Sequence, residues 1–180
     1  MNQVIFPVVG VIGAGAMGRG IAQIAAQAGS VVRLFDSRRE AVSEAVDSIT
    51  GQWIKLLEKG RLTQDTLEAN KARLIGASSL SALADCSLVV EAIVERLDVK
   101  QNLFAELESI VNPTAVLATN TSSLSVTAIA AGLRHRARFA GFHFFNPVPL
   151  MKVVEVIAGL KTANTVCEDL SRFAQQMGHR

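Results

Sequence analysis

One histidine and one glutamate lie in consecutive apolar segments near the end of the chain. His143 stands in GFHFF (141–145), and Glu155 follows twelve residues later in KVVEV (152–156). Both segments have the composition of buried strands, where an imidazole or a carboxylate is costly unless it has a partner. A carboxylate beside a neutral imidazole fixes its tautomer and raises its basicity, so the two residues are candidates for a proton-abstracting pair.

Strand alternation decides whether these two residues can meet. Alternation along 151–158 places Glu155 on the same face as Val153 and Ile157. The segment between the two strands contains two prolines, which favour a turn and exclude a central strand. If the strands lie near each other, His143 can reach Glu155. The alternative, on spacing alone, is a satisfied core histidine and a glutamate that faces water from an edge strand.

A glycine-rich motif near the N-terminus has the form of a phosphate-binding turn. GAGAMG (13–18) is G-x-G-x-x-G, placed between an apolar run and a helical pattern. In that setting the first glycine permits a tight turn, the second lets a pyrophosphate approach the backbone, and the third allows close helix–strand packing. The helix N-terminus adds free N–H groups and a positive dipole. We therefore predict a dinucleotide site at Gly13, Ala14, Gly15, Ala16, Met17 and Gly18.

Asp36 ends the next apolar run, 18 residues after Gly18. An acidic residue at this place accepts hydrogen bonds from the adenosine ribose and repels a 2′-phosphate, so NAD is favoured over NADP. Arg38 and Arg39 weaken that preference, since either could meet a phosphate. The alternative is that the glycines serve only a tight turn and that Asp36 only caps a helix.

The elements that must position these residues alternate between strand and helix. Strands are predicted at Val8–Gly13, Val31–Asp36, Cys86–Ile93, Ala115–Thr119, Arg138–His143 and Met151–Ala158. Helices are predicted at Gly18–Ala28, from a capping box at Ser37 and Glu40 to Gly60, from Thr63, from Asp98, and at Thr165–Met177. Continuous apolar strands that alternate with helices predict an α/β fold: a Rossmann-like, doubly wound, mostly parallel sheet covered on both faces.

The predicted helix that ends at Gly60 is longer than one face of a sheet needs. At ~1.5 Å per residue it would measure ~33 Å. We predict that it projects as a helical arm over about residues 37–73, with a shorter helix from Thr63 turning back along it. Trp53 stands on the apolar stripe of this helix and is expected to pack in the core or the arm.

Composition excludes several classes of protein. The chain has 180 residues, of which 49% are hydrophobic and 19% charged, as in ordinary globular proteins. A net charge of +2 is too small to argue for a nucleic-acid or membrane partner. No apolar run is long enough to span a bilayer, and the N-terminus lacks the pattern of a signal peptide. Cys86 and Cys167 have no metal-like or redox-like spacing; they are expected to be buried in a cytoplasmic protein without a metal.

Four segments resemble the L-3-hydroxyacyl-CoA dehydrogenase family. They are VIGAGAMGRGIAQIAAQAG (11–29), VVEAIVE (89–95), ATNTSSL (118–124) and GFHFFNPVPLMKVVEV (141–156). The resemblance runs from about Val8 to the C-terminus. It implies an NAD-binding domain and the reversible, NAD-dependent oxidation of an (S)-3-hydroxyacyl-CoA to the 3-oxoacyl-CoA.

The resemblance also implies catalytic roles for three residues. His143 matches the general base that takes the proton from the 3-hydroxyl group. Glu155 matches the carboxylate that orients the imidazole and stabilises its charged form. Ser122 matches a hydroxyl that contacts both substrate and cofactor; a turn residue or helix N-cap is the plainer alternative.

Further matches concern the cofactor and coenzyme A. Asn146, Glu95 and Lys100 match residues of the cofactor site, although a turn residue and solvated charges are the plain alternatives. Lys59 matches a lysine directed toward coenzyme A. The serine expected about one helical repeat earlier is replaced by Gln52, so the acyl-CoA contacts of the arm stay open. His135 and His179, the remaining histidines, show no functional pattern.

Family chains normally continue into a second, helical domain that supplies dimer contacts and closes over the acyl-CoA. The resemblance therefore implies that residues 1–180 are the NAD-binding domain of a longer homodimeric enzyme, able to bind NAD(H) but poorly active alone. The family serves fatty-acid β-oxidation, butanoate metabolism and aromatic breakdown such as that of phenylacetate. Two alternatives stand: a related dehydrogenase of a non-CoA hydroxy acid such as L-gulonate, and a non-enzymatic nucleotide-binding protein. The latter does not need His143, Glu155 and Ser122 together.

Overall fold

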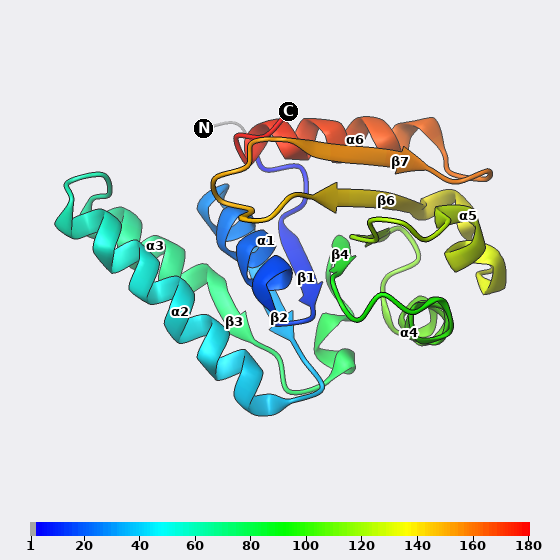
Figure 1. The fold of residues 1–180 in the computed structure, drawn as a ribbon, viewed down its shortest axis with the longest axis horizontal. Helices are drawn as coiled ribbons and strands as arrows, with labels where there is room; N and C mark the ends of the chain where they lie inside the picture. Colours follow the sequence, from blue (N-terminus) through cyan, green and yellow to red (C-terminus); the bar gives the residue numbers. More distant parts are fainter. Residues whose placement is uncertain (1–2) are drawn as a thin grey trace.

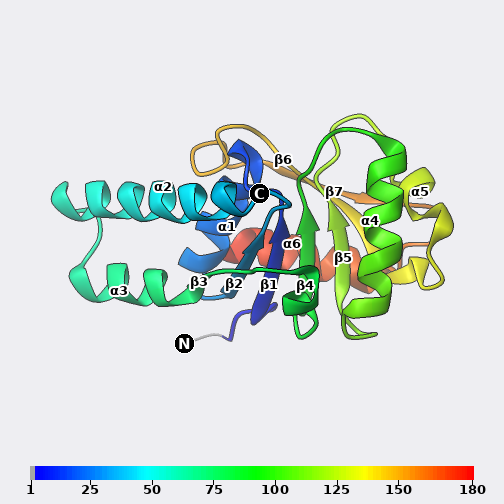
Figure 2. The same cartoon turned by 90° about the horizontal axis from the view of Figure 1, so that it is seen from below.

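The computed structural model describes residues 3–180, so Met1 and Asn2 of the predicted domain lie outside the described residues. Its centre is a seven-stranded sheet in the order β3-β2-β1-β4-β5-β6-β7 (Figures 1 and 2). Neighbouring strands from β3 to β6 run parallel, and β7 pairs antiparallel with β6. The predicted Rossmann-like α/β fold is confirmed. The strand order reverses between β1 and β4, and ligands of such sheets bind beyond the carboxyl ends of the strands at this point.

Most of the elements lie within a few residues of their predicted bounds. The strands are β1 (Val8–Ile12), β2 (Val31–Phe35), β3 (Leu74–Gly76), β4 (Leu88–Glu91), β5 (Val116–Thr119), β6 (Phe139–Phe144) and β7 (Val154–Ala158). The helices are α1 (Ala16–Gln27), α2 (Arg39–Glu58), α3 (Gln64–Arg73), α4 (Leu97–Ile110), α5 (Val126–Ile129) and α6 (Asn164–Gln176). The sequence pattern did not predict β3 or α5, and β7 begins three residues later than predicted because residues 151–153 are exposed and unpaired with β6.

Helices cover both faces of the sheet, with α4 and α6 on opposite sides (Figure 2). On one face α1, α2, α3 and α6 bury a core that includes Ile21, Trp53 and Phe173. On the other face α4 and α5 bury a second core around Phe104 and Phe139. Because β4 and β5 lie between these two cores, every residue of both strands is buried, as their continuous apolar sequences indicate.

The predicted arm is formed by α2 and α3, which project together to one side of the sheet (Figure 1). The 20 residues of α2 make a helix of ~30 Å. Its apolar stripe packs inward, and Trp53 is fully buried. The Thr63 hydroxyl accepts a hydrogen bond from the amide of Thr66 (3.2 Å) and caps α3, which begins where the sequence predicts a helix.

The predicted capping box at the start of α2 is wrong. Helix α2 begins at Arg39, and neither Ser37 nor Arg38 caps it through a side chain. The side chain that binds backbone amides at this place is Asp36. Its Oδ1 accepts from the Arg38 N–H (2.9 Å) and its Oδ2 from the Ala14 N–H (2.8 Å). A charged acceptor makes the stronger hydrogen bond. Asp36 therefore ties the start of α2 to the glycine turn.

The two cysteines are both free, and they differ in environment. Cys86 is buried as predicted, and burial, followed by the nearby charge of Asp85, raises the pKa of its thiol to about 12. The expectation is wrong for Cys167, which lies in α6 and is partly exposed. Among the helices of residues 3–180, none has the length and apolar character needed to cross a membrane.

Candidate active site

The glycine motif turns the chain from β1 into α1. Gly13 has a φ of +102°, and a Cβ there would lie 2.4 Å from the carbonyl oxygen of Ala92. A Cβ on Gly18 would lie 1.6 Å from the carbonyl oxygen of Gly13. By contrast, a Cβ on Gly15 would meet nothing within 4 Å. The fold thus requires the first and third glycines, whereas the second borders open space at the start of α1.

The N-terminus of α1 fits a pyrophosphate. Gly15 is the N-cap residue, the cap has no side-chain hydrogen bond, and the first turn holds no acidic residue. The first backbone hydrogen bond of α1 runs from the amide of Arg19 to the carbonyl of Gly15 (2.9 Å). The amides just before Arg19 therefore have no acceptor within the helix. Those donors and the helix dipole favour an anion at this place.

Asp36 stands immediately after β2, beside the glycine turn. Its two oxygens accept from the amides of Ala14 and Arg38, and each retains a further lone pair. The carboxylate is therefore held in place and can still accept from a ribose hydroxyl. Arg38 and Arg39 are exposed next to it. The structure thus retains both features that bear on the choice between NAD and NADP: a carboxylate that can bind the ribose, and two arginines that could meet a phosphate.

A cleft of about 350 Å³ lies at the carboxyl ends of β4, β5 and β6. It is lined by Met17, Ala92, Ile93, Glu95, Asn120, Ser122, His143, Phe144, Phe145 and Asn146. Five of these were singled out from the sequence, namely Met17, Glu95, Ser122, His143 and Asn146. They come from the start of α1, from the loops after β4 and β5, and from the end of β6 and the loop after it, and the fold brings them to one place.

His143 and Glu155 lie opposite each other in the antiparallel pair of β6 and β7. Nδ1 of His143 is 2.8 Å from Oε2 of Glu155. The side chain of His143 is 14% exposed and that of Glu155 is 55% exposed. The expectation that both are buried is therefore wrong for Glu155, because β7 is an edge strand and leaves that carboxylate in water. With Nδ1 bonded to the carboxylate, Nε2 is the ring nitrogen left to exchange a proton.

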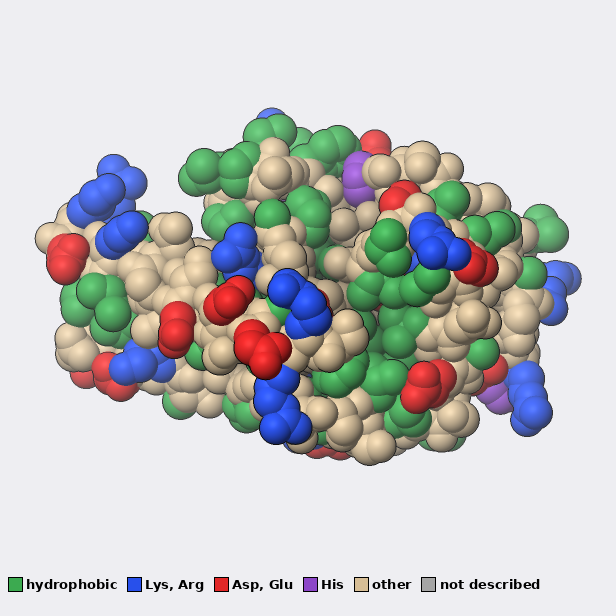
Figure 3. All heavy atoms as spheres, turned by 60° about the horizontal axis from the view of Figure 1, so that its bottom comes forward, with side chains coloured by type: hydrophobic (Ala, Val, Ile, Leu, Met, Phe, Trp, Pro, Cys, Tyr) green, Lys and Arg blue, Asp and Glu red, His purple; other side chains and the backbone are tan. Residues whose placement is uncertain are grey.

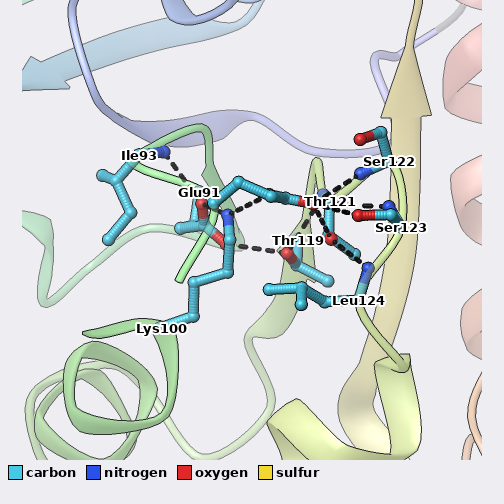
Figure 4. Close-up of polar contacts among 9 residues, drawn as sticks. Glu91, Ile93, Lys100, Thr119, Thr121, Ser122, Ser123 and Leu124 are labelled. Atoms are coloured by element: carbon cyan, nitrogen blue, oxygen red, sulfur yellow. Dashed lines mark hydrogen bonds and ion pairs between the residues drawn. The ribbon is translucent and has the colours of Figure 1, made fainter. Parts of the chain in front are cut away.

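Glu95 holds the loop that carries Thr121, Ser122 and Ser123, which are labelled in Figure 4. Its Oε1 accepts from the amides of Ser122 (3.0 Å) and Ser123 (3.3 Å) and from the hydroxyl of Thr121. Burial alone would raise the pKa of Glu95, but these donors and the ammonium of Lys100 lower it to about 2. Glu95 is consequently a carboxylate at neutral pH, and it places one negative charge on the wall of the cleft.

The structure does not bring the two predicted lysines to the lining of the cleft. Lys100 is buried beneath it, with Nζ 2.5 Å from Oε2 of Glu91 and 3.3 Å from Oε2 of Glu95. Lys59 is the exposed C-cap residue of α2, and the end of α2 lies far from the end of β6 (Figure 1).

Three other polar residues of the region were not singled out from the sequence. Glu91 and Thr119, at the ends of β4 and β5, hydrogen-bond to each other (2.7 Å between Oγ1 and Oε1). Asn120 Oδ1 accepts from the amide of Phe144 (2.8 Å) and joins the loop after β5 to β6. An acidic residue that ends an otherwise apolar strand, with a lysine nine residues later, was the pattern that could have revealed Glu91.

His179, which showed no functional pattern, is buried outside the cleft. Its Nε2 lies 3.0 Å from the carbonyl oxygen of Val148, and its Nδ1 lies 3.2 Å from that of Met177. His179 therefore joins the end of α6 to the loop that follows β6. His135, the other histidine without a functional pattern, is exposed.

The strand order, the glycine turn and the acidic residue after β2 together define a dinucleotide-binding domain of the Rossmann type. A family model described as "3-hydroxyacyl-CoA dehydrogenase, NAD binding domain" matches residues 8–180. The chain belongs to this family, and NAD is accordingly its cofactor.

Two curated relatives illustrate the similarity. The 3-hydroxyadipyl-CoA dehydrogenase of Escherichia coli is 47% identical over 170 residues, which are 94% of this chain and 36% of that protein. A probable 3-hydroxybutyryl-CoA dehydrogenase of Deinococcus radiodurans is 46% identical over 169 residues, covering 94% of this chain and 60% of that protein. The chain thus spans less than two thirds of the length of either relative.

Solved structures agree with this assignment. A 3-hydroxybutyryl-CoA dehydrogenase from Escherichia coli superposes with a TM-score of 0.95 at 45% identity, covering all of this chain and 38% of that one. An (S)-3-hydroxybutyryl-CoA dehydrogenase from Ralstonia eutropha gives a TM-score of 0.93 at 37% identity, covering 97% of this chain and 62% of that one.

Proposed function

We propose that this chain is the NAD-binding part of an NAD-dependent (S)-3-hydroxyacyl-CoA dehydrogenase, which oxidises the 3-hydroxyl group to a ketone reversibly. One observation carries the proposal: His143, bonded to Glu155, lines the same cleft as Ser122, at the carboxyl ends of the strands and beside the glycine turn. The names of the relatives support the substrate class.

The chemistry follows from the placement of these side chains. NAD⁺ held at the glycine turn would accept the hydride from C3 of the substrate. His143 takes the hydroxyl proton at Nε2, while Glu155 on Nδ1 keeps the tautomer and stabilises the imidazolium that forms. General-base catalysis of this kind contributes ~10²–10⁴-fold. In the reverse direction the same imidazolium returns the proton to the alkoxide.

Ser122 and Asn146 are proposed to position the reactants. Ser122 stands on a loop whose amides Glu95 fixes, so its hydroxyl can contact both the substrate oxygen and the cofactor. Asn146 lines the cleft immediately after β6 and is proposed to contact the cofactor near the nicotinamide. Holding the two reactants together in one cleft removes much of the entropic cost of a bimolecular hydride transfer.

We also propose that residues 1–180 are one domain of a longer, homodimeric protein whose second domain covers the acyl-CoA. The length of the relatives supports this arrangement. So do three large hydrophobic side chains that are exposed in the loop between β6 and β7, Leu150, Met151 and Val153. Hydrophobic side chains gather at the upper rim of the space-filling view (Figure 3). Such a domain alone is expected to bind NAD(H) and to turn over slowly.

The proposed coenzyme A contacts lie on the arm. Lys59, exposed at the end of α2, is proposed to meet the coenzyme A phosphates. Gln52, on the preceding turns of the helix, lines a second cleft of about 410 Å³ together with Leu150 and Lys152. We propose that Gln52 replaces the serine expected at this place as a polar contact to the acyl-CoA.

The pathway and the location belong to the same proposal. We propose a role in fatty-acid β-oxidation or in the breakdown of aromatic compounds such as phenylacetate. The relatives named for 3-hydroxybutyryl-CoA and for 3-hydroxyadipyl-CoA support these two directions. A cytoplasmic location is proposed because both cysteines are free thiols.

A steady-state assay of the full-length protein tests the function. Acetoacetyl-CoA, longer 3-oxoacyl-CoAs and a dicarboxylic 3-oxoacyl-CoA are each offered with NADH or NADPH. We expect oxidation of NADH that requires a 3-oxoacyl-CoA substrate. The acyl chain that is reduced fastest identifies the pathway. Turnover of L-gulonate without a CoA substrate would assign a related dehydrogenase instead. NADH binding without any turnover would leave a nucleotide-binding protein.

A further inference from the structure

Glu91 ends β4 with a carboxylate that is wholly buried, and three donors surround it (Figure 4). Its Oε2 accepts from Nζ of Lys100 (2.5 Å) and from the amide of Ile93 (2.8 Å). Its Oε1 accepts from the hydroxyl of Thr119 (2.7 Å). A buried carboxylate with all these partners is held rigidly, and removing a single partner is costly in so low a dielectric.

Lys100 connects this buried carboxylate to the wall of the cleft. Its Nζ lies between Oε2 of Glu91 and Oε2 of Glu95, and its side chain is 1% exposed. Glu95 reaches the cleft and holds the amides of Ser122 and Ser123. A continuous chain of polar contacts therefore runs from Glu91 at the end of β4, through the ammonium of Lys100 and the carboxylate of Glu95, to the loop after β5.

Two threonines make the same connection a second time. The Thr119 hydroxyl donates to Glu91 and accepts from the amide of Thr121 (3.3 Å). The Thr121 hydroxyl in turn donates to Glu95 and accepts from the amide of Leu124 (3.0 Å). The loop after β4 and the loop after β5 are thus joined at both carboxylates.

Glu91 and Lys100 are absent from the lining of the cleft, so their side chains act on a ligand only through the lining residues that they contact, Ile93 and Glu95. We propose that Glu91 and Lys100 are positioning residues: their buried ion pair anchors Glu95, and Glu95 fixes the backbone of the loop that presents Ser122. The meaning of this device for catalysis rests on the proposed function, because Ser122 acquires its role there. The coupling of the two loops is a property of the chain itself.

The test measures amide exchange in the 180-residue chain by NMR, with thermal unfolding and NADH fluorescence on the same samples. The variants are Lys100→Met, Glu91→Gln and the double variant that carries both. Replacing both members of a buried pair by uncharged side chains avoids the unpaired buried charge that makes a single replacement costly. The melting temperature of the double variant should therefore return toward that of the wild type. Glu95 still lacks its cation there, and the amides of Ser122 and Ser123 should exchange ~10-fold faster, the effect of losing about one hydrogen bond.

NADH should also bind several-fold more weakly to the double variant than to the wild type. Arg96→Gln is the matched control, because Arg96 stands in the same loop and its exposed ion pair is with Asp98 in the first turn of α4. The control should change neither the exchange of the two amides nor the NADH affinity. The two proposals can fail separately. If the amides of Ser122 and Ser123 exchange faster in the double variant than in the wild type, but the wild type binds no NADH, the proposed function fails while the coupling of the two loops stands.

The inference is overturned if the amides of Ser122 and Ser123 exchange at the wild-type rate in a folded Lys100→Met or double variant. The ion pair of Glu91 and Lys100 would then serve the fold alone. If the Lys100 variants do not fold, Glu91→Gln is judged by the same criterion. The glutamine keeps one acceptor oxygen for the neighbouring donors. Faster exchange of the Ser122 and Ser123 amides in this variant supports the inference, and unchanged exchange overturns it.

Discussion

Nδ1 of His143 lies 2.8 Å from Oε2 of Glu155, across two strands in which these residues are direct partners. The contact therefore does not depend on a flexible loop. The backbone pairing on either side, Phe142 with Val156 and Phe144 with Val154, fixes the separation of the two side chains. An imidazole held in this way keeps one orientation toward the cleft before any ligand arrives.

Replacing His143 by Gln should strongly lower turnover and leave cofactor binding intact. Loss of the general base is expected to lower kcat of the full-length enzyme ~10²–10⁴-fold. The dissociation constant for NADH, measured by fluorescence titration, should change less than about 2-fold, or ~0.4 kcal/mol. Equal losses in turnover and in NADH affinity would contradict the assignment of His143 as the base.

Replacing Glu155 by Gln should lower kcat less than the His143 substitution does. The amide can still contact Nδ1, but it carries no charge to stabilise the imidazolium, and it no longer fixes one tautomer. Glu168→Gln, at an exposed position of α6, is a control of the same chemistry. A Glu155 variant as active as the Glu168 variant would reduce Glu155 to a surface contact.

Replacing Gly15 by Ala should separate ligand binding from folding. The new Cβ meets nothing in the protein, so the free energy of unfolding should fall by less than about 1 kcal/mol, the cost of a poorer N-cap residue. The methyl group occupies the space proposed for the pyrophosphate, and NADH affinity should fall at least ~10-fold, which corresponds to ~1.4 kcal/mol. Isothermal titration and chemical denaturation measure the two quantities.

Gly51→Ala provides the matched control for that substitution. Gly51 lies within α2, where a Cβ also meets nothing within 4 Å. Alanine in a helix interior should stabilise the chain by ~0.5–1 kcal/mol without altering NADH binding. If Gly15→Ala binds NADH as well as Gly51→Ala does, the pyrophosphate does not approach the backbone at Gly15.

Acid should weaken the fold through Glu95. Its pKa is about 2 in the folded chain against an ordinary value of 4.5, so the unfolded chain binds more protons as the pH falls. The stabilisation from Glu95 is therefore complete above about pH 4.5 and is lost as the pH falls toward about 2. Thermal unfolding of Glu95→Gln and of the wild type should differ most at neutral pH and converge near pH 2. A constant difference across this range would contradict the depressed pKa.

Much of the fold could be predicted because its strands are continuous apolar runs. The segments that form β1, β4 and β5 are buried almost throughout, which periodicity and composition reveal. The three residues of β3 could not be predicted, since two of them are exposed and the run is too short to show a period. The start of α2 was misplaced because the sequence pattern does not reveal that Asp36 binds the amides of Ala14 and Arg38, or that Arg38 rather than Ser37 is the N-cap residue.

The candidate site was predictable where chemistry and motif coincide. A histidine inside an apolar strand and a glycine motif before a helix both attract notice, and His143 and Gly15 lie where expected. The support beneath the cleft was not predictable, because Glu91 and Lys100 find each other only through the packing of α4 on the sheet. The burial of Glu155 was misjudged, since an apolar run does not reveal that β7 is an edge strand.

A crystal structure of the chain with NADH tests the central claim most directly. The pyrophosphate should lie over Gly15 at the start of α1, the ribose should bind Asp36, and the nicotinamide should enter the cleft lined by Glu95, Ser122 and Asn146, facing His143. A nicotinamide bound elsewhere, or a His143 that has turned from Glu155 and from the ring, would contradict the dehydrogenase mechanism.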